Sequence, residues 1–272
     1  MTPANVRLTA KKVALIVCFT ALYAVFAAIP IFQLVGSAGR ISAAAIMAPI
    51  IGVLLGPYLG ALSAFLGGTI GLSYGSFLPM SFVSGIVTTL CAGLLYDGKR
   101  AWCFIIYFLF LVLHGFYPGI GPVWLFPPYI WFQVIGLLLL LSPLQSMAVK
   151  NLKSTAWSRS IRWPRLRSPL NPTAAKNPKS KNISIALLSF FVISLTSTLA
   201  GQISGSLTFL VLFPNSPVVQ LGLFQVLYVQ YPIERTIIAL GSAFIGAPLS
   251  KILMSAKLLP LISQDNIRGR IP

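Results

Sequence analysis

The sequence predicts an all-α integral membrane protein, a polytopic bundle of about eight transmembrane helices. Apolar residues make up 57% of the 272 residues, charged residues make up 8%, and the mean hydropathy is +0.88. These values lie far outside the range of soluble proteins. A helix needs about 20 mainly apolar residues to cross the roughly 30 Å hydrocarbon layer, and it satisfies its own backbone hydrogen bonds. The long apolar runs are therefore predicted to be spans.

Eight such runs follow one another along the chain. They cover residues 12–30, 41–56, 58–75, 78–96, 101–117, 129–149, 183–212 and 232–256. The first run has the basic start of a signal peptide, but its apolar stretch is longer than a typical signal core, so we predict a retained span. The second and third runs are short and are joined only by Gly56–Tyr58. We expect them to form either a tight hairpin or a partly re-entrant pair.

Small residues recur at helical spacing in several of these runs. Such residues let helix backbones approach closely where the hydrophobic effect cannot drive association. The third run carries the rows Gly56, Gly60, Ala64, Gly68 and Gly67, Gly71, Gly75. The seventh run carries Ser197, Gly201 and Gly205, and the first carries Thr20, Ala24 and Ala28. Together the rows predict a tightly packed bundle.

The formal net charge of +17 is placed in a way that favours membrane topology over a nucleic-acid partner. With a cytoplasmic N-terminus, eight spans put all but two of the 20 basic residues on the cytoplasmic side. The exceptions are Arg40 and Arg235, which each begin a span on the outer side. The sequence therefore predicts a plasma-membrane protein with both termini in the cytoplasm and no nucleic-acid partner.

The basic segment 150–182 divides the chain into N-terminal spans over 1–149 and C-terminal spans and a tail over 183–272. It holds no acidic residue and cannot build a core of its own. It serves as a flexible cytoplasmic connector, or it lays its tryptophans and arginines against anionic lipid headgroups. Either way the spans before and after it form one integrated membrane domain.

Residues that carry chemistry are scarce in this chain. It lacks a phosphate-binding loop of the ATPase type, and His114 is its single histidine. Asp97, Glu234 and Asp265 are its three acidic residues, which leaves no metal-ligand cluster, no paired carboxylates and no catalytic triad. We therefore expect no enzyme, no resident metal and no cofactor.

The predicted outer face is the exception, because polar and aromatic residues gather there. Pro232 fits the first turn of a helix, and Glu234 suits the positive end of its dipole. Arg235 opposes that dipole, so it either snorkels outward beside Glu234 or faces a pocket for an anionic group. The aromatics form an interfacial belt or stack on a polar organic ligand. The candidate substrate-binding residues are Gln33, Arg40, Tyr74, Trp124, Gln225, Tyr231, Glu234 and Arg235.

Three segments together resemble a known family. They are "KKVALIVCFTALYAVFAAIP", "APIIGVLLGPYLGALSAFLGGTIG" and "YPIERTIIALGSAFIGAPLSKIL". In this order they resemble the substrate-binding S components of energy-coupling factor (ECF) transporters, which capture vitamins or metal ions. The resemblance covers residues 8–96 and 183–256. It implies a six-helix core, so the predicted hairpin over 101–149 looks like an insertion.

The resemblance also implies partners. In that family a small-residue stripe on the first helix meets a transmembrane coupling subunit, which carries two cytoplasmic ATPases. Here Ala24 and Ala28 match the stripe, and Thr20 precedes them on the same face. We therefore expect the substrate-capture component of an ECF-type importer. The alternatives are a carrier or channel that works alone and a structural membrane scaffold.

Overall fold

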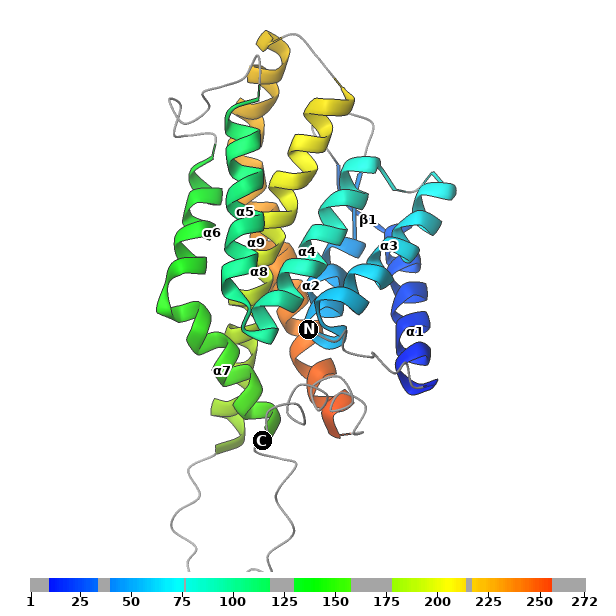
Figure 1. Ribbon diagram of the computed structural model, residues 1–272, viewed down its shortest axis with the longest axis vertical. Helices are drawn as coiled ribbons and strands as arrows, with labels where there is room; N and C mark the ends of the chain where they lie inside the picture. Colours follow the sequence, from blue (N-terminus) through cyan, green and yellow to red (C-terminus); the bar gives the residue numbers. More distant parts are fainter. Residues whose placement is uncertain are drawn as a thin grey trace, which may run out of the picture.

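The structure, a computed structural model, describes residues 10–33, 40–75, 77–117, 130–157, 178–213 and 217–255, and these ranges are mostly helical (Figure 1). Side chains are not described at 11, 155–157, 178–182, 217–228 and 254–255. The elements are α1 (Ala10–Ala27), β1 (Pro30–Gln33), β2 (Arg40–Ser42), α2 (Ala44–Leu55), α3 (Pro57–Ser73), α4 (Pro79–Asp97), α5 (Arg100–Gly115), α6 (Trp131–Leu141), α7 (Pro143–Trp157), α8 (Pro178–Leu212) and α9 (Pro217–Ser255).

Three of these helices are long and apolar enough to cross a membrane. The qualifying segments are Pro79–Tyr96 in α4, Ile183–Leu212 in α8 and Val229–Leu253 in α9. A fourth crossing arises if α6 and α7 together form one span, bent by 62° at Ser142. The chain is accordingly an all-α membrane protein.

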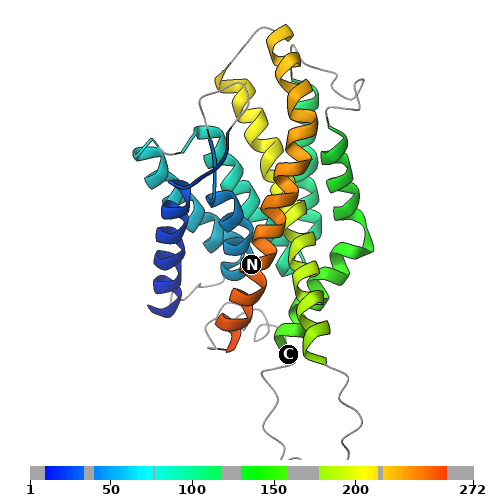
Figure 2. The ribbon, with the colours of Figure 1, turned by 180° about the vertical axis from the view of Figure 1, so that it is seen from behind.

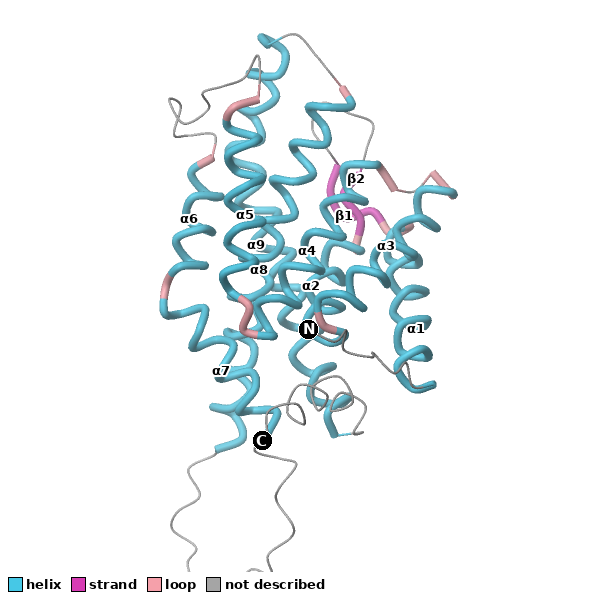
Figure 3. Tube along the Cα trace, in the orientation of Figure 1, coloured by secondary structure: helices cyan, strands magenta, loops and turns pink. Residues whose placement is uncertain are grey.

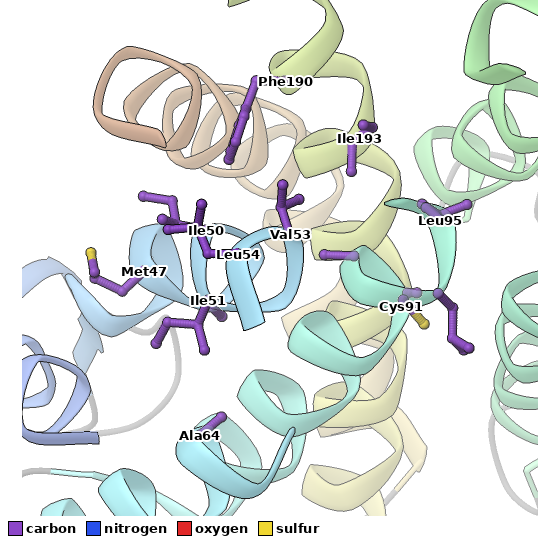
Figure 4. Close-up of a cluster of buried hydrophobic side chains, with 14 of the residues drawn as sticks. Met47, Ile50, Ile51, Val53, Leu54, Ala64, Cys91, Leu95, Phe190 and Ile193 are labelled. Atoms are coloured by element: carbon purple, nitrogen blue, oxygen red, sulfur yellow. The ribbon is translucent and has the colours of Figure 1, made fainter. Parts of the chain in front are cut away.

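Helix α2 lies in the middle of the bundle and is buried along nearly its whole length. Its twelve residues extend about 18 Å, well short of the hydrocarbon thickness. Figure 4 shows side chains of α2 among Cys91 and Leu95 of α4 and Phe190 and Ile193 of α8. Its apolar character therefore serves the core. It turns directly into α3 at Gly56, whose φ of 80° favours glycine.

Small residues permit the closest helix contacts. A Cβ on Gly201 of α8 would lie 1.9 Å from Thr88 Oγ1 and 2.5 Å from the carbonyl oxygen of Ser84, both on α4. A Cβ on Gly67 of α3 would lie 2.7 Å from the carbonyl oxygen of Thr20 on α1. These approaches are too close for a side chain, so the predicted packing role of the small residues is confirmed at these positions.

Two predicted helix boundaries are wrong. Helix α9 begins at Pro217 rather than at Pro232, which lies inside the helix. An internal proline removes one backbone donor, a loss that membrane helices tolerate when side chains rearrange nearby. The predicted span 129–149 is also not one straight helix, because α6 ends before Pro143 and α7 leaves at an angle.

The ends of several helices gather at one end of the bundle. The start of α1, the end of α7, the start of α8 and the end of α9 all lie in the lower half of Figure 1. The same arrangement appears from behind in Figure 2. The end of α7 and the start of α8, which flank the basic segment, thus lie on the same side of the bundle as the start of α1. Residues 158–177 of that segment lie outside the described ranges.

Candidate functional site

A short β-hairpin joins α1 to α2 and lies beside the upper part of α4, below the upper ends of α5, α8 and α9 (Figure 3). Strands β1 and β2 pair antiparallel, and Gln33 lies opposite Arg40 in the ladder. Both of these side chains are exposed. The hairpin is also tied to α9, because Gln230 Nε2 donates to the backbone carbonyl oxygen of Gln33 at 3.4 Å. Two predicted substrate-binding residues are thereby placed next to α9.

The same glutamine reaches the single glutamate of the chain. Gln230 Nε2 donates to Glu234 Oε1, one helical turn further along α9. Glu234 is only 2% exposed. Gln230 therefore links the hairpin to a buried carboxylate through one side chain.

Arg235 completes this group of polar side chains on α9. It is 7% exposed, so it does not snorkel to the surface. Its guanidinium carbon lies 5.9 Å from the centre of the Tyr231 ring, a cation–π distance. The Tyr231 hydroxyl interacts in turn with Ser206 of α8. We call Gln230, Tyr231, Glu234 and Arg235 the polar cluster of α9.

The position of this cluster within α9 removes the helix-dipole explanation for Glu234 and Arg235. Since α9 starts at Pro217, neither residue lies in the first helical turn, and the helix dipole explains neither of them. Both lie within the candidate span Val229–Leu253. Charged residues at such positions are energetically costly and typically mark ligand or ion pathways.

Part of the polar cluster lacks hydrogen-bond partners. Within the described part of the chain, Glu234 Oε2 and Arg235 Nε are buried and have none. A buried polar atom without a partner costs about 1–3 kcal/mol, and more when the group is charged. The cluster therefore holds one acceptor and one donor whose hydrogen-bonding capacity is unused.

The structure brings together five of the eight predicted substrate-binding residues, namely Gln33, Arg40, Tyr231, Glu234 and Arg235. Tyr74 follows the end of α3 and is 82% exposed, without a described contact to the cluster. Trp124 and the side chain of Gln225 lie outside the described residues. Ser206 was not predicted, since a serine inside an apolar run carries no signal of its own.

The predicted partner residues on α1 divide between two faces. Thr20 Oγ1 lies 3.1 Å from Ser63 Oγ on α3, so Thr20 faces the bundle. Ala24 is half-buried and Ala28 is exposed. The exposed face of α1 carries small and β-branched residues, among them Ala14, Val17, Cys18, Ala21 and Val25, and the exposed Ala28 directly follows the end of the helix.

A metal centre has no obvious place among these side chains. Over the residues that the structure describes, no group of three or more His, Cys, Asp or Glu side chains is positioned to hold an ion. The polar cluster supplies a single carboxylate, an amide and a guanidinium, which suit an organic molecule better than a cation. Comparison with known proteins identifies no matching family, no matching curated protein and no matching solved structure.

Proposed function

We propose that this chain is the membrane-embedded substrate-capture component of an ECF-type importer and that its substrate is a vitamin-like small molecule. The observation that carries the proposal is the buried polar cluster of α9, bonded through Gln230 to the hairpin between α1 and α2. An ionisable pair within a candidate span favours a binding role over a packing role. The chain has no ATPase loop, so an external coupling subunit and ATPases would supply the energy.

The proposed topology follows the eight predicted segments and puts the hairpin on the outer side, with the short helix α2 extending only part of the way across the layer inside the bundle. Each predicted span corresponds to one helix or, for 129–149, to the bent pair α6 and α7. The basic residues at the ends of α4, α7 and α9 then face the cytoplasm, as the positive-inside rule requires. Helix α2 needs no lipid contact of its own, because its neighbours surround it.

Helix α1 provides the surface for the coupling subunit. It lies at the edge of the bundle (Figure 1), and its inner face packs against α2 and α3. The outer face has only small and β-branched residues, which allow another helix to approach closely. Ala28 is the residue of the predicted stripe that this surface exposes most clearly.

A carrier that works alone is the second candidate, and the burial of Glu234 favours it. Ion-coupled carriers place acidic residues inside the membrane, and Glu234 is such a residue. Uptake into proteoliposomes that contain only this chain would support the carrier. Binding without such uptake would support the capture component.

The decisive test replaces Ala28 with tryptophan. Under the proposal, Ala28→Trp obstructs the approach of the coupling subunit while the polar cluster, on α9, stays intact. We expect the variant to lose co-purification with coupling subunits and uptake in cells, and to keep the small molecules that native mass spectrometry finds on the wild-type protein. Leu138→Trp on α6, another exposed position, is the matched control and should retain all three properties.

Each outcome has a distinct meaning. Normal uptake by Ala28→Trp would remove the proposed docking surface and with it the main support for the capture component. Loss of folding together with binding would assign α1 an internal packing role. The more buried Ala24 gives a less clear test, because a tryptophan there would disturb the contact of α1 with the bundle.

A further inference from the structure

Gln202 of α8 is a buried residue to which the sequence assigned no role. Its side chain is 3% exposed, and both its Nε2 and its Oε1 lack a hydrogen-bond partner within the described part of the chain. A glutamine amide has two donor hydrogens and an acceptor oxygen, and native proteins pair most such groups. A second buried glutamine with an unpaired nitrogen, Gln145, still accepts a hydrogen bond from Thr196 at 3.2 Å.

The contacts between α8 and α9 place Gln202 at the level of the polar cluster. The helices run side by side in opposite directions (Figure 2). Ser206 of α8 meets Tyr231 of α9, and near the other end Phe190 lies so close to Gly246 that no Cβ would fit there. One turn inward from the contact between Ser206 and Tyr231, α8 carries Gln202 and α9 carries Arg235.

Unpaired polar atoms therefore gather at one depth of the bundle. Gln202 contributes a donor and an acceptor, Arg235 contributes the donor Nε, and Glu234 contributes the acceptor Oε2. Three side chains from two neighbouring helices leave hydrogen-bonding capacity unused in a region with little water. A single molecule that forms hydrogen bonds with all of these atoms would remove the energetic cost of several unpaired polar groups at once.

We propose that Gln202 is a specificity-determining residue of the outward site, and that this site takes a small organic monoanion that also carries a planar amide-like group. The amide-like group, such as a carboxamide, lactam or ureido group, presents a donor beside an acceptor, which complements the two free atoms of Gln202. The inference rests on the proposed binding function and names the substrate class of the same site.

The charges of the site set the charge of the ligand. Arg235 and Glu234 are neighbours whose charges oppose each other, so the buried part is close to neutral. Arg40, on the exposed hairpin next to Gln33, adds one positive charge at the entrance. One negative charge on the ligand balances this excess, whereas a second would remain uncompensated in a medium of low dielectric.

The test uses synthetic probes in which the two features are separated. N-acetylglycine, N-acetyl-γ-aminobutyrate and N-acetyl-ε-aminocaproate combine a carboxylate and an amide at three spacings. Straight-chain carboxylates of equal length lack the amide, and the methylamides of the three probes lack the charge. Stabilisation of the detergent-purified full chain against heat, measured over a range of probe concentrations, gives an apparent Kd for each compound.

We expect at least one amide carboxylate to bind the wild-type protein about tenfold or more tightly than its matched carboxylate and its matched methylamide. In Gln202→Leu, which removes the amide at nearly constant size, this preference should disappear. Gln202→Met serves as a second variant should the first fail to fold, and Gln145→Leu is the matched control that should keep the preference. Either an equal affinity of wild type for probes with and without the amide, or an unchanged preference in folded Gln202→Leu and Gln202→Met, would overturn the inference.

A failure of this inference is distinguishable from a failure of the proposed function. The probes measure binding by the isolated chain, whereas the Ala28→Trp test measures co-purification with a coupling subunit. If the preference is absent while Ala28→Trp abolishes that co-purification, the capture component stands and the substrate class is wrong. If the preference is present and Ala28→Trp changes nothing, the binding site stands and the importer assignment is wrong.

Discussion

The replacement of Gly52 by alanine probes the tightest backbone contact of the buried helix α2. A Cβ at this position would lie 2.2 Å from the carbonyl oxygen of Thr89 on α4. It would also lie 2.9 Å from the Cβ of Ala92 and 3.0 Å from the backbone nitrogen of Gly93. Two of these neighbours are backbone atoms, so no flexible side chain can move aside, and α2 and α4 must separate.

The expected loss of stability follows from two opposing contributions. Overpacking of a well-packed core costs about 1–3 kcal/mol and occasionally more, and a contact against backbone belongs at the upper end of that range. Alanine is a better helix former than glycine by about 1 kcal/mol, which offsets part of this cost. The net effect on the free energy of unfolding is a loss of about 2 kcal/mol, or roughly a thirtyfold change in the ratio of folded to unfolded protein.

Gly241→Ala on α9 is the matched control. The nearest atom to its new Cβ is Cδ1 of Ile46 at 3.1 Å, the end of a flexible side chain. We expect this variant to be as stable as wild type or slightly more stable, because the gain in helix propensity remains. Unfolding in detergent micelles, followed by circular dichroism, compares the two variants. If Gly52→Ala proves as stable as Gly241→Ala, the close approach of α2 and α4 is wrong.

Three further predictions concern charge. Burial raises the pKa of the Asp97 carboxyl above its ordinary value against the opposing effect of two nearby lysines, so the folded state holds a proton that the unfolded state releases. The free energy of unfolding should fall as pH rises from the unfolded-state pKa of Asp97 to its higher folded-state pKa. Asp97→Asn should flatten this dependence of stability on pH. A cysteine at Ser168, outside the described residues, should resist impermeant external reagents in intact cells, and external labelling would refute the topology. Arg235→Gln should weaken binding of the co-purifying small molecule about tenfold or more, and Arg40→Gln less so, since Arg40 is exposed; unchanged affinity in both would leave these residues as interfacial anchors.

The membrane class and the helices of the bundle could be predicted because they depend on properties that add up along the chain. Apolar runs identify helices whatever they pack against, and each predicted span contains a helix. Rows of small residues likewise predicted close contacts at Gly67 and Gly201, since only backbone proximity needs them. The sequence does not distinguish a helix that faces lipid from one that other helices enclose. For that reason the buried position of α2 was not foreseen.

The candidate site was predictable only in part. Glu234 and Arg235 stood out because charged residues are rare in this chain, and they proved to be buried together. The start of α9 was misplaced because a proline such as Pro232 suits a helix start and is also tolerated inside a membrane helix. Gln202 carried no sequence signal, since its significance depends on which residue of α9 lies at the same depth.

The fold combines closely packed helices with buried polar groups that lack hydrogen-bond partners. Around α2 and α4 the backbones approach until no Cβ fits, as at Gly52 and Gly93. On α8 and α9, Gln202, Glu234 and Arg235 leave polar atoms unpaired in the described structure. Unpaired groups of this kind lower stability and persist only where the rest of the fold compensates for them. The glycine-packed core supplies that compensation, and a ligand that pairs these polar atoms would stabilise the part of the bundle that holds them.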